Sequence, residues 1–230
     1  MQEQLDLYAS VHKGLRHAMQ STLFQLGRLD ATDPKDVAET VAELCDLVGW
    51  LEKHLEIEER FVHTAIDRKR PGAVAEIRQD HEGHQRDFVL LLTDAVALDQ
   101  AAPDAVAERK ALAHHLYLSF SRFVGDNLVH MALEETAVNA LLWDLFTNDE
   151  LQAIFAQIMA SESPEQLKRG VRWILPALDP DQRAKLVQRA RANIPAPVFE
   201  QLLGTMRASL SPRDFAKLDA ALAVAPSQAA

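Results

Sequence analysis

The chain has 230 residues, 48% of them hydrophobic and 25% charged, a composition typical of a globular protein and not of a disordered one. Its formal net charge of −10 argues against general nucleic-acid binding, which needs a basic surface. No uncharged apolar run reaches the roughly 18 residues of a transmembrane helix. The start of the chain lacks an apolar signal segment, and the single cysteine, Cys45, fits a reducing compartment. We therefore expect a cytoplasmic protein without a membrane partner, in which Cys45 is an inert, buried thiol.

The spacing of apolar residues is helical through most of the chain. It predicts four long helices, over residues 3–28, 35–68, 73–99 and 104–145. The breaks between them contain proline, and Asp33 followed by Pro34 matches a helix N-cap with proline at the first helical position. No alternating strand pattern is present. The sequence thus predicts an all-α fold, with an up-down-up-down four-helix bundle over residues 1–146.

Residues 147–230 have a different pattern, with shorter apolar segments and more frequent proline. The helix-start signals there are Thr147 with Glu150, Ser163-Pro164, Asp179-Pro180 and Ser211-Pro212, while Pro195 and Pro197 are expected to interrupt a further helix. We expect four or five short helices and a frayed end at APSQAA. The charge divides at the same place: residues 1–146 carry 14 Lys and Arg against 25 Asp and Glu, and residues 147–230 carry 10 against 9. This region is predicted to be a helical extension, and the sequence leaves its role open: a protein partner or self-association through these helices are the options.

Each long helix has an apolar stripe that is interrupted by one polar patch containing histidine. The polar residues on these stripes are His12 on the first helix, His54 and Glu58 on the second, His81 and His84 on the third, and Asn127, His130 and Glu134 on the fourth. A lone histidine of this kind is usually a core residue with a hydrogen-bond partner. The two His-x3-Glu pairs place each His and Glu on one helix face, but that spacing alone is weak evidence for a site.

The level of these residues along the predicted bundle is more informative than their spacing. At about 1.5 Å per residue, all of the His and Glu positions fall within one or two turns of the same layer. Two buried carboxylates in one layer would be costly without a cation, and no Lys or Arg occupies the adjoining stripe positions. Four imidazoles and two carboxylates therefore predict a dinuclear metal site. Nitrogen and oxygen ligands without a thiolate favour iron or manganese over a structural zinc ion.

At these residues the sequence resembles the hemerythrin-like, or HHE cation-binding, family. The resemblance runs through VHKGLR at 11–16, HLEIEE at 54–59, DHEGH at 80–84 and HMALEE at 130–135, within residues 5–145. It implies a four-helix bundle that holds two iron ions (Fe2+/Fe3+) bridged by an oxo or hydroxo group, with manganese or zinc as substitutes. The implied ligands, carried over position by position, are His12, His54, Glu58, His81, His130 and Glu134.

The sequence departs from the oxygen-carrying hemerythrins at two points. Those proteins have a His-x3-His pair on the third helix and a His-x4-Asp pair on the fourth. Here Gln85 occupies the position of the second histidine in the first pair, and the second pair is His130-x3-Glu134. His84 is then an additional ligand, an outer neighbour of the ligands or a bystander. The pattern is more similar to bacterial and regulatory hemerythrin-like proteins, so simple oxygen carriage is in doubt.

Other polar residues near the stripes are interpreted as neighbours or bystanders. Tyr8 and Asn127 are either core residues or hydrogen-bond partners of the ligands. His63 lies five residues after Glu58, about 140° around an α-helix, which predicts a surface position. The residues expected to face solvent are His17, His63, His114, His115, Glu59, Glu135, Arg183, Lys185, Arg189 and Arg191.

From these patterns we expect a non-haem di-iron protein that binds or reacts with dioxygen or a related small oxidant such as peroxide or nitric oxide. The alternative is an iron or oxygen sensor that signals through the C-terminal helices. A di-iron nitric oxide reductase or peroxidase-like enzyme comes third, and a metal-free helical scaffold last. The sequence assigns no catalytic residue.

Overall fold

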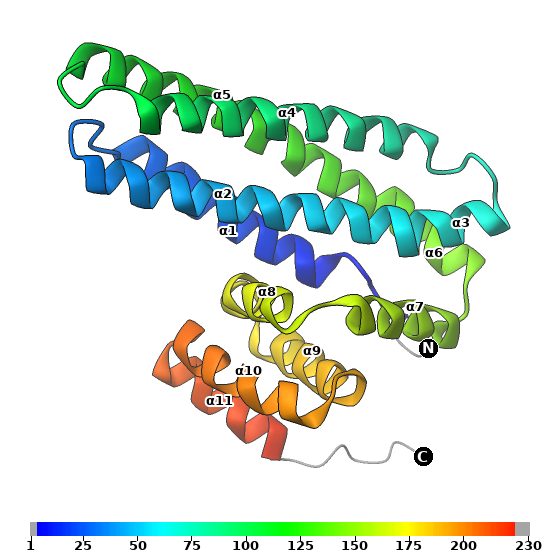
Figure 1. Cartoon of the computed structure of the whole chain (residues 1–230). Coiled ribbons are helices and arrows are strands. Elements are labelled where there is room, and N and C mark those ends of the chain that lie inside the picture. The colour runs from blue at the N-terminus through cyan, green and yellow to red at the C-terminus, as the bar shows by residue number, and fades with distance from the viewer. Residues whose placement is uncertain (1–3, 224–230) are drawn as a thin grey trace. The chain divides into compact units, whose positions relative to one another are not determined.

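The structure is a computed structural model that describes residues 4–223. The described chain is helical and contains no strand (Figure 1), which confirms the all-α prediction. It divides into two compact units. The α2–α6 unit comprises residues 18–145, and the α7–α11 unit comprises the described parts of residues 1–17 and 146–230. None of the described helices combines the length and apolarity that a membrane span requires. The segment expected to fray lies outside the described residues.

The α2–α6 unit consists of long helices joined by short turns. Its helices are the second half of α1 (Ala9–Arg28), α2 (Pro34–Ile57), α3 (Thr64–Lys69), α4 (Ala75–Gln100), α5 (Val106–Leu133) and α6 (Asn139–Leu145). Two π-helical segments, η1 (Glu58–His63) and η2 (Glu134–Val138), join α2 to α3 and α5 to α6 without a break. α4 contacts both α2 and α5, and in Figure 1 these three helices lie side by side with alternating directions. The start of α2 and the end of α3, both ends of α4, and the start of α5 and the end of α6 lie within two residues of the predicted helices 35–68, 73–99 and 104–145.

The first helix begins later than the sequence pattern predicts. α1 starts at Ala9, because the Asp6 carboxylate accepts hydrogen bonds from the backbone N–H groups of Tyr8 (2.8 Å) and Ala9 (2.9 Å). A side-chain acceptor at this place satisfies N–H groups that have no partner within the helix, and so fixes where the helix starts. Residue 3, the predicted start, lies outside the described residues.

The α7–α11 unit contains short helices with a core of their own. They are α7 (Asn148–Ser161), α8 (Pro164–Ala177), α9 (Pro180–Asn193), α10 (Ala196–Ser209) and α11 (Pro212–Ala223). The predicted capping box of Thr147 and Glu150 is present at the start of α7. Pro195 and Pro197 do not interrupt a helix as predicted. They begin α10, because proline is tolerated in a first turn, where its missing N–H is not needed.

Two nitrogen-bearing side chains of this unit are not solvated, contrary to the prediction. Arg183 is buried and donates hydrogen bonds to the carbonyl oxygens of Leu175 (2.9 Å) and Leu178 (2.8 Å) at the end of α8. His17 is half-buried and packs edge-on against Trp173, with ring centroids 5.6 Å apart. The partner of Arg183 is the end of the preceding helix, and the partner of His17 comes from a distant part of the chain. The periodicity of a single helix reveals neither contact.

The prediction of a buried thiol is also wrong. Cys45 is exposed, because it is one position away from Leu44 on the inward face of α2. Partial desolvation and the nearby Asp99 carboxylate raise the pKa of the thiol above its ordinary value. His114 and His115 are exposed, as predicted.

The buried faces of α2 and α5 continue across the π-helical segments with a shift of one residue. A π turn closes hydrogen bonds from i to i+5 and so inserts one residue into the helical repeat. Here Thr64 N–H bonds to Glu59 O, and Asn139 N–H bonds to Glu134 O. The buried residues after the shift are Val62 and Ile66, where an unbroken α-helix would bury Phe61 and Ala65, and Val138 and Leu142, where it would bury Ala137 and Leu141. Periodicity at 100° per residue therefore fails beyond each glutamate.

We expect Phe120→Ala to lower the free energy of unfolding by about 3–5 kcal/mol, because it removes a fully buried ring from a close-packed core. Leu118→Ala on the same helix is the matched control, since Leu118 is 51% exposed, and should cost less than about 1 kcal/mol. Urea unfolding followed by circular dichroism measures both. Equal losses would contradict the assignment of Phe120 to the core.

Candidate metal centre

Five of the six predicted ligands meet in the core of the α2–α6 unit. The first pair is His54, in the last turn of α2, and Glu58, the first residue of η1. Both are buried, and His54 Nε2 lies 3.0 Å from Glu58 Oε1. The second pair is His130, in the last turn of α5, and Glu134, the first residue of η2, with His130 Nε2 3.4 Å from Glu134 Oε2. Each pair thus places its nitrogen and oxygen atoms on one side of its helix, as the i,i+4 spacing predicts.

His81 on α4 connects these two pairs. Its Nε2 atom lies 3.5 Å from Glu58 Oε2, 3.5 Å from Glu134 Oε1 and 3.1 Å from His130 Nε2. Ligand atoms of His81, His130 and Glu134 all lie within 4.8 Å of one another, and the same is true of His54, Glu58 and Glu134. Two overlapping groups of three nitrogen and oxygen donors that share Glu134 are spaced closely enough to hold a metal ion.

The sixth predicted ligand, His12, belongs to the α7–α11 unit. It is fully buried near the start of α1, where its ring centroid lies 5.2 Å from that of Tyr8. Its backbone N–H donates to Tyr8 O. Tyr8 is itself buried, as a core residue would be, while ligation by His12 and a hydrogen bond from Tyr8 to a ligand stay predictions.

Burial and charge set the protonation of the cluster. Glu58 and Glu134 are 2% and 0% exposed. Burial and the Glu58 charge each favour a neutral Glu134, but hydrogen bonds from His130 and His81 outweigh them and lower the pKa of Glu134. Burial likewise opposes a charged His130, but Glu134 outweighs it and raises the pKa of His130. The Glu134 carboxylate is therefore kept ionised in the core, where it can bind a cation.

His84 and Asn127 lie beside the cluster. The His84 ring packs edge-on against His130, with centroids 4.7 Å apart, and against Phe123 at 6.0 Å. Desolvation, reinforced by the charges of His130 and His81, lowers the pKa of His84 to about 4, so its imidazole is neutral near pH 7. Asn127 donates to Phe123 O at 3.0 Å, within its own helix. His84 therefore packs against a predicted ligand, and Asn127 satisfies a backbone carbonyl.

Two residues that the sequence interpretation places at the surface belong to this region. His63 is 0% exposed, and its ring stacks on His81 with centroids 5.1 Å apart. Its Nδ1 atom lies 3.0 Å from Glu59 Oε1, and Glu59 is half-buried. The prediction is wrong because η1 is π-helical, so the fifth residue after Glu58 returns to nearly the same side of the helix. The spacing of His54, Glu58 and His63 is visible in the sequence, but it predicts a buried His63 only if the π turn is already known.

Glu59 is held in place by a positive charge. It accepts a hydrogen bond from Arg78 Nε at 2.8 Å, and Arg78 also pairs with Asp67. Burial would raise the pKa of Glu59, but the hydrogen bonds from Arg78 and His63 outweigh this effect and lower it. On its other side, Glu59 Oε1 lies 3.3 Å from His81 Nδ1. One ionised carboxylate thus faces the Nδ1 atoms of two buried histidines, and a similar contact of 3.4 Å joins Asp80 to His130 Nδ1.

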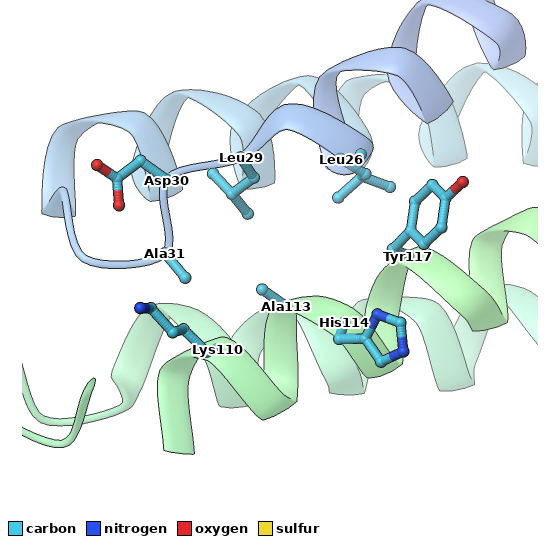
Figure 2. A pocket seen from close by; sticks show the side chains of 9 residues that line it. Leu26, Leu29, Asp30, Ala31, Lys110, Ala113, His114 and Tyr117 are labelled. Carbon is cyan, nitrogen blue, oxygen red and sulfur yellow. The ribbon is translucent and has the colours of Figure 1, made fainter. Parts of the chain in front are cut away.

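A surface pocket of this unit lies at a different place. It is formed by the end of α1, the following turn and α5 (Figure 2), and is lined by Leu26, Gly27, Leu29, Asp30, Ala31, Lys110, Ala113, His114 and Tyr117. None of the predicted ligands lines it. The buried cluster, and not this pocket, is therefore the candidate functional site.

Comparisons of the chain with models of protein families, with curated proteins and with solved structures found no match.

We expect a divalent metal ion to stabilise the protein through the cluster. Adding Co2+ or Mn2+ to metal-free protein should raise the midpoint of thermal unfolding, because a ligand that binds only the folded state adds about 2.7 kcal/mol at a hundredfold excess over its Kd. Glu58→Gln should remove this increase, and Glu56→Gln should retain it, since Glu56 is exposed on the same turn. The increase should disappear as pH falls and protons compete for the imidazoles. Equal increases in both variants would place the metal elsewhere.

Proposed function

We propose that the chain is a non-haem di-iron protein with a hemerythrin-like four-helix bundle, which binds or reacts with dioxygen, peroxide or nitric oxide. The observation that carries the proposal is the meeting of His54, Glu58, His81, His130 and Glu134 in a buried core. Two ionised carboxylates inside a protein need compensating positive charge. The described contacts between these carboxylates and other side chains are to histidines, a residue type that commonly binds metals.

The donor set fits a pair of borderline or hard cations. Imidazole nitrogens and carboxylate oxygens without a thiolate suit iron or manganese, and zinc would also be accepted. We propose that His12, His54, Glu58, His81, His130 and Glu134 would hold the two metals. Bound iron would supply one-electron redox chemistry with a small oxidant. The protein's own residues would hold the metals, balance their charge and limit access to them.

Aromatic packing next to the histidines supports a small apolar ligand. The Phe123 ring lies 5.5 Å from Phe88 and 5.9 Å from Phe120, centroid to centroid, and all three are buried. His84 and Phe123 are in edge-on contact beside His130. An apolar wall of this kind excludes water and tolerates a diatomic gas, whereas it offers no hydrogen-bond partners for a larger polar substrate.

Iron analysis tests this proposal. Protein loaded anaerobically with Fe2+ should hold about two irons per chain, and His54→Ala should lose iron, while His115→Ala should retain it because His115 is exposed. Admitting air or nitric oxide should change the visible spectrum, and azide should shift the spectrum of the oxidised protein. A stable adduct favours binding, and continued consumption of oxidant favours an enzyme. Full iron content in His54→Ala would refute the assignment.

An iron or oxygen sensor is the second candidate, and contacts at the start of α1 favour it. Lys13 follows the predicted ligand His12 and donates to Gln182 on α9, and His17 contacts Trp173 on α8. The residues around His12 therefore pack with the C-terminal helices in one unit. A change in metal occupancy at His12 would be felt by α8 and α9, which we propose then bind a protein partner or a second copy of the chain.

Limited proteolysis distinguishes the sensor from a protein whose C-terminal helices are passive. If the sensor proposal is right, removing iron should speed cleavage within residues 147–223, because loss of a ligand loosens the helices that pack with it. His12→Ala should show the fast cleavage whether or not iron is present. Cleavage at the same rate with and without iron would contradict the sensor and leave the metal proposal intact.

A further inference from the structure

We propose that His63 is an additional metal ligand of this centre, binding through Nε2, and that Glu59 holds it in the ligating orientation. The inference rests on the proposed function, because it adds a fifth imidazole to the same metal site. His63 lies outside the ligand set that the resemblance implies, and helical periodicity places it on the opposite side of its helix.

The position of His63 is the first argument. Its side chain is 0% exposed, and its ring is stacked on that of the predicted ligand His81 at 5.1 Å and 26°. Its Nε2 atom lies 4.0 Å from Glu134 Oε1. This is too long for a hydrogen bond, and among the described residues Nε2 has no hydrogen-bond partner. A buried ring nitrogen that faces a ligand carboxylate at this separation has room for a metal ion to contact both.

The proton on His63 is the second argument. Nδ1 lies 3.0 Å from the Glu59 carboxylate, which can only accept a hydrogen bond when ionised, so the proton is assigned to Nδ1. Neutral imidazole then presents a lone pair at Nε2, on the side of Glu134. A carboxylate that accepts from one ring nitrogen while the other binds the metal is the usual way in which proteins fix the tautomer and ring orientation of a histidine ligand.

Glu59, His63 and His81 also approach one another within 4.8 Å, which on distance alone would allow a separate cation on the Nδ1 side. The charge nearby excludes this arrangement. The Arg78 guanidinium lies 2.8 Å from Glu59 Oε2 and would repel a cation there. Glu59 is therefore a hydrogen-bond acceptor for His63 and a charged neighbour of His81 Nδ1, and the Nε2 atoms of both histidines are left for the metal.

The two halves of the cluster show how this ligand arises. In each half a His-x3-Glu pair is followed by a π turn, and the fifth residue after the glutamate is fully buried: His63 after Glu58 and Asn139 after Glu134. The π turn brings that residue back to the glutamate's side of the helix. One half then offers an imidazole and the other an amide, so we expect the two metal positions to differ in affinity.

Co2+ tests the inference in the full-length, metal-free protein, because histidines bound to Co2+ give strongly shifted imidazole N–H proton signals. The unmutated protein should show five such signals, from His12, His54, His63, His81 and His130. His63→Gln should remove one signal and weaken Co2+ binding by at least about tenfold. Glu59→Gln should keep the five signals, move the one from His63, and weaken binding by about tenfold. Free imidazole added to His63→Ala should restore part of the Co2+ absorption.

Matched controls separate this inference from the proposed function. His114→Gln should bind Co2+ as the unmutated protein does, since His114 is exposed. Tight binding in which no shifted signal is assigned to His63 in the unmutated protein would overturn the role of His63 while the metal proposal stands, and this measurement does not depend on whether a variant folds. Unchanged affinity in a folded His63→Gln would overturn it as well. Failure of the unmutated protein to bind either Co2+ or Fe2+ would overturn both proposals.

Discussion

The burial of two glutamates in a helical core is the constraint on which the rest of the α2–α6 unit depends. Glu58 and Glu134 lie almost wholly out of water, and a carboxylate in that environment costs several kcal/mol unless it is paired. Histidines on α2, α4 and α5 provide nitrogen atoms around both of them. Two buried carboxylates destabilise a core that has only a structural role. In a metal site a bound cation would compensate their negative charge.

The π-helical segments are the local device that serves this constraint. Each begins at one of the two glutamates, four residues after the buried histidine in the last turn of α2 or α5. The inserted residue changes which side chains face inward for the remainder of the helix, so that Val62 and Val138 are buried in place of Phe61 and Ala137. Segments of this kind occur mostly at functional sites, because a weaker hydrogen-bond pattern is retained where it places a side chain that a regular helix would not.

A second layer of charge orients the histidines. Glu59 faces the Nδ1 atoms of His63 and His81 and is held by Arg78, while Asp80 approaches Nδ1 of His130. Acceptors on the outer side of the rings leave Nε2 atoms for the inner side, where Glu58 and Glu134 lie. In the proposed metal centre the inner carboxylates would bind the metals and the outer ones would orient the histidines, a division of roles that follows from which nitrogen each carboxylate faces.

The sequence by itself determined the long helices after the first and several helix starts, because apolar spacing and capping residues such as Asp33 and Thr147 act locally. It also determined that the two His-x3-Glu pairs and His81 share one layer, since helix length converts residue number into height. Only the tertiary structure decided what depends on contacts between different helices: Glu59 paired with Arg78, Arg183 bonded to the end of the preceding α8, and His17 packed on Trp173. His63 falls between these cases. Its five-residue spacing from Glu58 was readable in the sequence, but only a π turn, which the α-helical repeat does not predict, turns that spacing into a position in the core.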